Sequence, residues 1–248
     1  MAADSGFFQW VVFLIGEYGP RLLRGAGVTL LIALIGTIVG CIIGLLVGVI
    51  HAIPAREIKN PLRRTLVHAV QGVMAAYVEI FRGTPMIVQA VVIYYGAMTV
   101  FQIDMSPLFA GFFVVSINTG AYMAETVRGG ILAVPHGQVE AGKALGMHHF
   151  QTMFRIVLPQ ALRNILPQIC NNFIINIKDT SVLMVISVTE LFYVSQTAAG
   201  TYYRYFEVYF ITCCMYFIMT FTISKLLRCL EKKLAGSKNY DLVKEGSH

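Results

Sequence analysis

The sequence predicts an all-α, polytopic membrane protein of five transmembrane helices, with the N-terminus outside and the C-terminus in the cytoplasm. Of its 248 residues, 56% are apolar and only 13% are charged, and the mean hydropathy is +0.68. Soluble domains carry about a quarter charged residues. Long uncharged stretches and an uneven placement of Lys and Arg point the same way. These observations exclude a soluble enzyme and a free nucleic-acid-binding protein, and they make the lipid bilayer the solvent of most of the chain.

Several stretches are long and apolar enough to cross a membrane, which takes about 20 residues of helix. Three of them carry no charge and a fourth is rich in aromatic residues; they are Gly25–Ile50, Gly83–Ile103, Met105–Ala124 and Val208–Ser224. A weaker candidate, Leu162–Val188, is interrupted by Arg163 and by Lys178–Asp179. Charge inside a span is expensive, so this stretch needs a functional or structural reason.

The stretch Leu66–Gln102 would form about 55 Å of helix, against roughly 30 Å of hydrocarbon. It is either two spans, or one span preceded by an interfacial segment. Most of the 19 Lys and Arg residues lie in three segments: His51–Arg64, Arg128–Arg163 and the tail from Lys225. If all three are cytoplasmic, an even number of crossings separates each pair. Leu66–Gln102 then crosses once, and the net charge of +6 reflects topology rather than nucleic-acid binding.

The same reasoning divides the chain into three parts. We expect an extracytoplasmic or interfacial segment over 1–24, a transmembrane domain over 25–230 with a cytoplasmic loop at about 132–160, and a cytoplasmic tail over 231–248. Met1–Gly16 does not resemble a signal peptide, because it lacks a basic start and contains Asp4. Phe7, Phe8 and Trp10 instead indicate an interfacial anchor.

The first span carries a stripe of small residues, with a glycine at every fourth position: Gly36, Gly40, Gly44 and Gly48. Such stripes let helix backbones approach closely in lipid. Tight packing inside one subunit and contact between subunits both remain open.

No catalytic or metal-binding constellation is predicted. The five cysteines show no CxxC or metal-type spacing, and His148–His149 is an adjacent pair that suits a metal poorly. Gly137–Ala144 has the Gly-x4-Gly-Lys spacing of a phosphate loop, but Ala144 stands where Ser or Thr must reach Mg²⁺, and no strand precedes it. We therefore expect no ATP hydrolysis, no metal and no cofactor bound by this chain itself.

The cytoplasmic loop contains a helix from about Val134 to Leu145, which places Ala141 and Ala144 on one face. Gly146 suits the left-handed cap that ends such a helix. Small residues on an exposed helix let it seat in the cleft of a partner protein. Pro159 and Pro167 are expected to break the chain into a short segment and the fourth span.

The same loop follows a layout written EAA-x3-G-x9-I-x-L-P. The matching residues are Glu140, Ala141, Gly142, Gly146, Ile156, Leu158 and Pro159. This resembles the cytoplasmic signature loop of membrane subunits of ABC importers. Three flanking stretches look like the polar amino-acid permease family of the histidine/glutamine type: Tyr77–Pro85, Asn118–Gly130 and Lys178–Ser181. The resemblance runs from about Leu22 to Leu234. It departs at Gly142, where a second Ala is usual and where glycine should loosen the helix slightly.

The resemblance implies a type I ABC importer-like bundle in a bacterial cell membrane, which passes amino acids, polar or charged, by alternating access. In the family this loop docks on the ATPase subunits, so the coupling role is carried over to Glu140, Ala141, Gly142, Ala144, Gly146, Ile156, Leu158 and Pro159. The implied partners are two ATPase subunits, which bind ATP and Mg, and a second copy of this chain or a paralogous permease. An extracytoplasmic substrate-binding protein would deliver cargo to an outer face formed partly by Asp104–Pro107 and Glu190–Glu207.

Polar side chains inside the spans are the candidates for the substrate path, since such residues usually face the bundle interior or a water-filled route. One helix face of the third span and one of the fourth repeat the spacing i, i+4 and i+7. With the neighbouring lysine, the set is Asn118, Tyr122, Glu125, Asn172, Asn176, Lys178 and Asp179. Two interpretations stay open: either Lys178 and Asp179 serve structure and only the amides contact cargo, or Asp179 binds the cargo ammonium. Glu79, Arg82 and Gln89 lie on the long second segment, where structural roles are favoured for the charged pair.

Two other classes of function compete with the importer. A self-contained secondary transporter or channel would show an internal inverted repeat, and none is convincing in five spans. An integral-membrane enzyme would need a catalytic constellation. The sequence leaves open which amino acid is carried, whether the second subunit is this chain again, whether the host is Gram-positive or Gram-negative, and whether Gly246–His248 is native.

Overall fold

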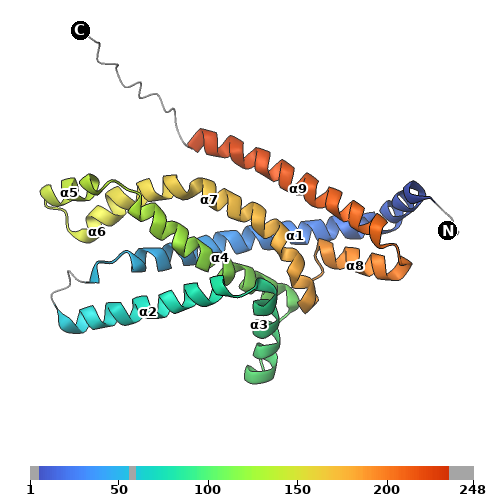
Figure 1. The fold of residues 1–248 in the computed structure, drawn as a ribbon, viewed down its shortest axis with the longest axis horizontal. Coiled ribbons are helices and arrows are strands. Elements are labelled where there is room, and N and C mark those ends of the chain that lie inside the picture. Colours follow the sequence, from blue (N-terminus) through green and yellow to red (C-terminus); the bar gives the residue numbers. More distant parts are fainter. Residues whose placement is uncertain (1–5, 56–59, 235–248) are drawn as a thin grey trace, which may run out of the picture.

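The computed structural model describes residues 6–55 and 60–234, and every regular element in these ranges is a helix (Figure 1). In chain order the elements are α1 (Phe7–His51), α2 (Pro61–Gly83), α3 (Met86–Phe101), α4 (Pro107–Leu132), α5 (His136–Ala144), α6 (His149–Thr152), the π-helix η2 (Met153–Val157), α7 (Leu158–Asp179), the 3₁₀ helix η3 (Thr180–Ile186), α8 (Leu191–Tyr202) and α9 (Tyr205–Leu234). The short helices α5 and α6 lie at one end of the long axis, and α8 lies at the other.

The all-α fold is confirmed, and so is the number of apolar spans when a bent pair is taken as one. Four helical runs are long and apolar enough to cross a membrane: Phe7–His51, Pro107–Leu132, His149–Ile186 and Tyr205–Glu231. The fifth candidate is the pair α2 and α3, which is bent by 114°. The tail beyond Leu234 lies outside the described residues, as do Arg56 and Lys59 of the first basic loop.

The bend divides the stretch Leu66–Gln102, which is expected to cross the membrane once, into α2 and α3, and its cause is local. Pro85 has no N–H to continue a helix, and it forces the preceding residue into extended backbone. Thr84 has φ −120° and ψ 146° accordingly. The side chain of Gln89 then donates 2.9 Å hydrogen bonds to the carbonyl oxygens of Phe81 and Thr84, which α2 leaves free at its end.

The glycine stripe packs inside the chain, against α4. An ideal Cβ on Gly40 would lie 2.6 Å from Thr119 Cβ, and one on Gly48 would lie 2.7 Å from Val127 Cβ. Side chains of α4 thus occupy the space that larger residues would need. Of the two interpretations of the stripe, the structure supports tight packing within one subunit.

Helix α1 begins at Phe7 and runs without a break past residue 24, so it extends for about 68 Å by its rise per residue. The side chain of Trp10 is only 7% exposed. Its ring lies 6.1 Å from the Tyr202 ring, and the Arg204 guanidinium sits 4.7 Å above it. The anchor prediction is therefore wrong for Trp10, because Tyr202 of α8 and Arg204, which precedes α9, cover its ring.

The expected breaks at Pro159 and Pro167 are also wrong. The helical run continues from His149 through η2 into α7, with Pro167 inside α7. In η2 the helix is wider, and the Leu158 N–H donates to the Met153 carbonyl five residues back. This π-type turn sits directly before Pro159, where an ordinary turn would bring the proline ring against the carbonyl four residues back.

Candidate functional site

Five of the seven predicted path residues line one pocket of about 290 Å³ between the α2–α3 bend, α4 and α7. They are Asn118, Tyr122, Asn172, Asn176 and Asp179. The remaining lining residues, which sequence reasoning missed, are Thr84, Pro85, Met86, Thr119 and Ile175. Three of them, Thr84, Pro85 and Met86, could have been predicted from the proline, because a proline-induced bend brings irregular backbone to the pocket wall.

Within this pocket the side chain of Asn176 joins three helices through hydrogen bonds. It is 5% exposed, and its Nδ2 donates to Thr37 Oγ1 at 2.8 Å and to Thr119 Oγ1 at 3.0 Å. These two bonds join α7 to α1 and α4 and use both N–H donors of the amide. The Thr37 hydroxyl is free to accept, since it donates to the Ala33 carbonyl at 2.7 Å.

The amide groups of Asn172 and Asn118 are less fully hydrogen-bonded than that of Asn176. Asn172 donates to the Gln168 carbonyl on its own helix at 3.3 Å. Asn118 donates to Gln89 Oε1 at 2.9 Å, and Gln89 braces the α2–α3 bend. Both amides therefore keep a carbonyl oxygen for a donor in the pocket, since an amide oxygen can accept two hydrogen bonds.

Asp179 is the single charged side chain lining this pocket among the described residues. The two other charged path residues do not join it. Lys178 lines two different pockets, both shared with α9, because adjacent residues on a helix point in different directions. Lys178 and Asp179 therefore do not form an ion pair inside this pocket.

Glu125 pairs with two arginines instead of facing the pocket. Its carboxylate lies 3.0 Å from Arg128 Nη2, where both oxygens accept hydrogen bonds, and 3.7 Å from Arg82 Nη1 on α2. The Arg82 guanidinium also sits 5.7 Å from the centre of the Tyr122 ring. This cluster links α2 to α4 beside the pocket wall that Tyr122 forms.

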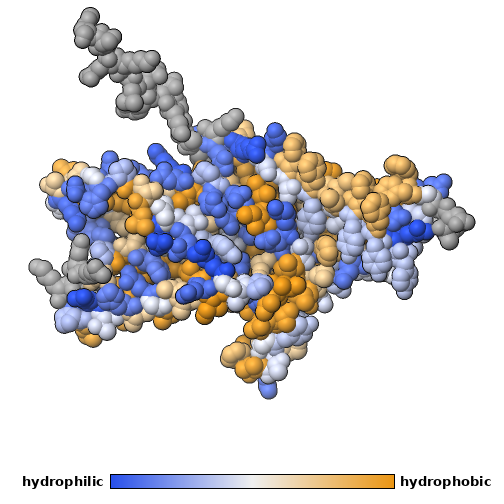
Figure 2. Space-filling model, in the orientation of Figure 1, coloured by the Kyte–Doolittle hydropathy of each residue, from blue (hydrophilic) through white to orange (hydrophobic). Residues whose placement is uncertain are grey.

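The loop that the sequence predicts to be cytoplasmic has the expected helix at its centre. A helix, α5, spans His136–Ala144, and Gly146 has the left-handed φ of 74°. Ala141 and Ala144 are exposed on α5, and Glu140 Oε1 lies 3.1 Å from His136 Nδ1. Figure 2 shows many hydrophilic residues over this end of the molecule, whereas α3 carries a hydrophobic surface.

Gly142, the departure from the EAA pattern, faces inward. An ideal Cβ there would lie 3.0 Å from Thr152 Cγ2 and 3.2 Å from Ile156 Cδ1. The glycine lets α5 pack closely on α6 and η2, which is a second consequence besides its effect on helix propensity. Leu158 is buried and Pro159 lies in the first turn of α7, so the end of the motif anchors the loop to the span.

Comparison with known proteins places this geometry in context. Residues 66–236 match the family described as binding-protein-dependent transport system inner membrane component. The glutamine transport system permease protein GlnP of Escherichia coli (strain K12) is 35% identical over 163 residues, which cover 65% of this chain and 74% of that protein. The L-cystine transport system permease protein TcyB of Bacillus subtilis (strain 168) is 36% identical over 173 residues, or 69% and 74%. A crystal structure of an amino acid ABC transporter with histidines contains a chain that superposes with a TM-score of 0.78 at 34% identity, covering 94% of this chain and 100% of that one.

Proposed function

The chain belongs to the family of binding-protein-dependent transport system inner membrane components, and on this premise we propose that the pocket around Asp179 receives an amino acid as it crosses the membrane. The protein is a permease subunit of an ABC importer for amino acids and resides in the bacterial cell membrane. A self-contained secondary carrier does not fit this family.

The observation that carries the proposal is the lining of the pocket. One carboxylate, Asp179, lies among the amide side chains of Asn118, Asn172 and Asn176, and Tyr122 also lines this pocket of about 290 Å³. A cargo ammonium would pair with Asp179, and the free amide oxygens of Asn172 and Asn118 would accept its remaining protons. Asn176 and Thr119 hold the wall in place through their mutual hydrogen bond rather than by binding cargo. The site favours polar, ammonium-bearing cargo.

Movement of cargo would depend on a separate ATPase that docks on the segment from Glu140 to Pro159. The exposed Ala141 and Ala144 offer a face without long side chains, which suits insertion into a cleft. Because Gly142 packs on Thr152 and Ile156, a push on α5 would be passed through η2 to α7. Helix α7 carries Asp179 at its far end. Two ATPase subunits would bind ATP and Mg, and this chain would bind neither.

The complete importer would contain a second permease, either another copy of this chain or a paralogue. A substrate-binding protein would deliver the amino acid at the opposite end from α5, where α8 and the start of α9 lie (Figure 1). Alternating access would follow from the ATPases closing on the two coupling loops.

The test is ATP-driven uptake by the reconstituted importer, with Asp179→Asn beside Glu17→Gln. Both changes remove one carboxylate, but Glu17 is an exposed residue of α1 and does not line the pocket around Asp179. We expect Asp179→Asn to lower uptake at least tenfold, which corresponds to one charge-assisted hydrogen bond, with intact assembly and unchanged uptake in the control. Normal uptake by Asp179→Asn would contradict the assignment.

A further inference from the structure

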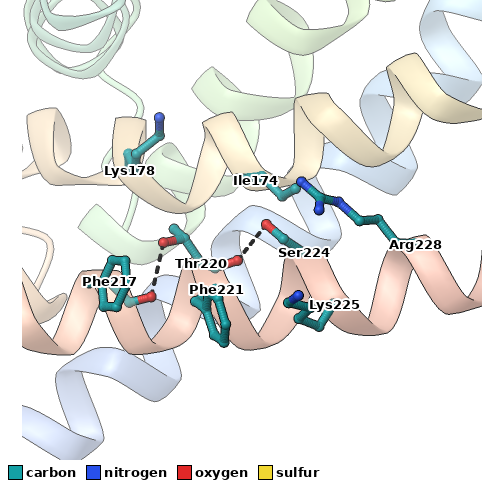
Figure 3. A pocket seen from close by; sticks show the side chains of 8 residues that line it. All are labelled: Ile174, Lys178, Phe217, Thr220, Phe221, Ser224, Lys225 and Arg228. Atoms are coloured by element: carbon teal, nitrogen blue, oxygen red, sulfur yellow. Dashed lines mark hydrogen bonds between the residues drawn. The ribbon is translucent and has the colours of Figure 1, made fainter.

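A second groove, separate from the cargo pocket, runs between α7 and α9 and has a volume of about 320 Å³ (Figure 3). Its lining contains three cations, Lys178 from α7 and Lys225 and Arg228 from α9, and no carboxylate among the described residues. Phe217 and Phe221 form the apolar part of its α9 wall. This groove shares no lining residue with the pocket around Asp179.

No carboxylate of the described residues lies at salt-bridge distance from the three cations, although Lys178 interacts electrostatically with Asp179 and the Lys225 ammonium lies 5.3 Å from the centre of the Phe221 ring. Asp179, although next in sequence to Lys178, lines the pocket on the other side of α7. Glu231, on the last turns of α9, interacts with Cys170. A cation inside a candidate span costs free energy unless an anion offsets its charge. We therefore expect an oxyanion to bind in this groove.

The hydroxyl groups in the groove do not supply alternative donors. Thr220 Oγ1 donates to the Tyr216 carbonyl at 2.8 Å. Figure 3 shows its longer contact of 3.2 Å with the Phe217 carbonyl, and the 2.6 Å hydrogen bond that Ser224 Oγ donates to the Thr220 carbonyl. Their protons are therefore engaged in the α9 backbone. The donors left for a ligand are the ammonium and guanidinium groups, which bind phosphate oxygens strongly.

Two features make a lipid the source of that phosphate. Phe217 and Phe221 are 65% and 52% exposed on a membrane-spanning helix, so acyl chains can lie along the same wall. Lys225 and Arg228 lie in the last turns of the span, next to a tail that the basic-residue pattern places in the cytoplasm. Basic pockets between helices on that side bind anionic headgroups.

We propose that the α7–α9 groove binds the phosphate of an anionic phospholipid, with Lys225 and Arg228 as its principal contacts and Lys178 as the third cation. The site is independent of the cargo pocket, and its purpose would be to hold α9 against α7 in a membrane that contains such lipids.

Native mass spectrometry of the full chain, purified in mild detergent and titrated with phosphatidylglycerol or phosphatidylcholine, tests this. We expect phosphatidylglycerol to bind preferentially, and K225Q/R228Q to weaken it about 25-fold, from roughly fivefold for each cation near the membrane surface. K233Q is the matched control, because Lys233 lies on the same helix outside the groove. Equal binding of the two lipids, or an unchanged double variant, would overturn the proposal.

Two further arms separate the other possible occupants. Phosphatidylglycerol displaced by millimolar inorganic phosphate would make this a site for soluble oxyanions and would overturn the lipid assignment. Benzoylphenylalanine in place of Phe221, irradiated in native membranes, should give a lipid adduct. A chain-to-chain adduct instead would show that a second subunit covers the groove, which would also overturn it.

Discussion

Asn118 Nδ2 donates a 2.9 Å hydrogen bond to Gln89 Oε1, and this bond links the wall of the pocket around Asp179 to the bend between α2 and α3. Gln89 in turn donates to the Phe81 and Thr84 carbonyls at the end of α2. One glutamine thereby satisfies the backbone that Pro85 interrupts and also orients an amide of the pocket wall. The bend and the pocket are a single hydrogen-bonded unit.

Replacing Gln89 with Leu should both destabilise the protein and reduce uptake. The change leaves the Thr84 carbonyl without its partner and leaves only the long 3.4 Å hydrogen bond between Asn118 Nδ2 and the Phe81 carbonyl, at about 1–3 kcal/mol for each unsatisfied buried group. Thermal unfolding in detergent measures the first effect, and reconstituted transport measures the second. Gln9→Leu, at an exposed position of α1, controls for the added apolar surface. A Gln89→Leu protein with wild-type melting and uptake would contradict the network.

Asn176 and Asn172 should behave differently when each is changed to Ala, although they lie one turn apart on α7. Asn176→Ala removes the tie to Thr37 and Thr119 and should cost about 2–3 kcal/mol of stability. Asn172→Ala removes only a bond within its own helix, so it should leave the melting temperature near that of the wild type and lower uptake. Parallel melting and uptake curves decide this. A stable Asn176→Ala variant would show that the tie is not structural.

Two glycines of α1 offer a matched test of its packing on α4. Gly40→Ala would place a Cβ 2.6 Å from Thr119 Cβ and 3.0 Å from the Ser116 carbonyl oxygen, so it should destabilise by about 1–3 kcal/mol. Gly27→Ala meets nothing within 4 Å and should stabilise α1 by up to about 1 kcal/mol. Unfolding in detergent should therefore move in opposite directions. Equal shifts would mean that the α1–α4 contact is loose.

Glu190, which precedes α8 and lies outside the candidate spans, should make stability depend on pH. Burial raises the pKa of its carboxyl above the usual range, against hydrogen bonds from the Phe192 and Tyr193 N–H groups and the Tyr216 and Thr29 hydroxyls. The folded state therefore holds the proton more tightly than the unfolded state. Its contribution to stability is full below the unfolded pKa and is lost as the pH rises through the folded pKa.

The measurement is the difference in melting temperature between the wild type and Glu190→Gln at pH 4 and at pH 8. Glutamine keeps a carbonyl acceptor for the helix cap but does not titrate. We expect the wild type to be relatively more stable at pH 4. A difference that is the same at both pH values would show that the carboxyl titrates normally.

Composition and charge placement were enough to predict the helical class and the spans, because lipid imposes length and apolarity on every crossing. They could not predict α8, since Leu191–Tyr202 is too short for a span and carries Ser and Thr as a loop would. Nor could they predict that Trp10 is covered, because the covering residues Tyr202 and Arg204 are almost two hundred residues away. The π-turn before Pro159 was missed for a local reason: proline indicates a break, and widening the helix is the rarer solution.

The pocket around Asp179 was partly predictable because helical spacing puts Asn118 and Tyr122 on one face of α4 and Asn172, Asn176 and Asp179 on one face of α7. That these faces meet follows only from packing. Spacing alone cannot separate a residue that binds from one that ties helices together, so Asn176 and Glu125 were grouped with the others. Their partners, Thr37 and Arg82, lie on other helices.

The central claim is that this permease is driven through its cytoplasmic loop by a separate ATPase. The most direct test is the mass of the intact complex after co-expression with the candidate ATPase subunit, comparing the wild type with Glu140→Lys and with the control Glu17→Lys. We expect two ATPase subunits with two permease subunits in the wild type and the control, and loss of the ATPase from Glu140→Lys. If the wild-type chain holds no ATPase, or if Glu140→Lys holds it equally well, the coupling role of this loop is contradicted.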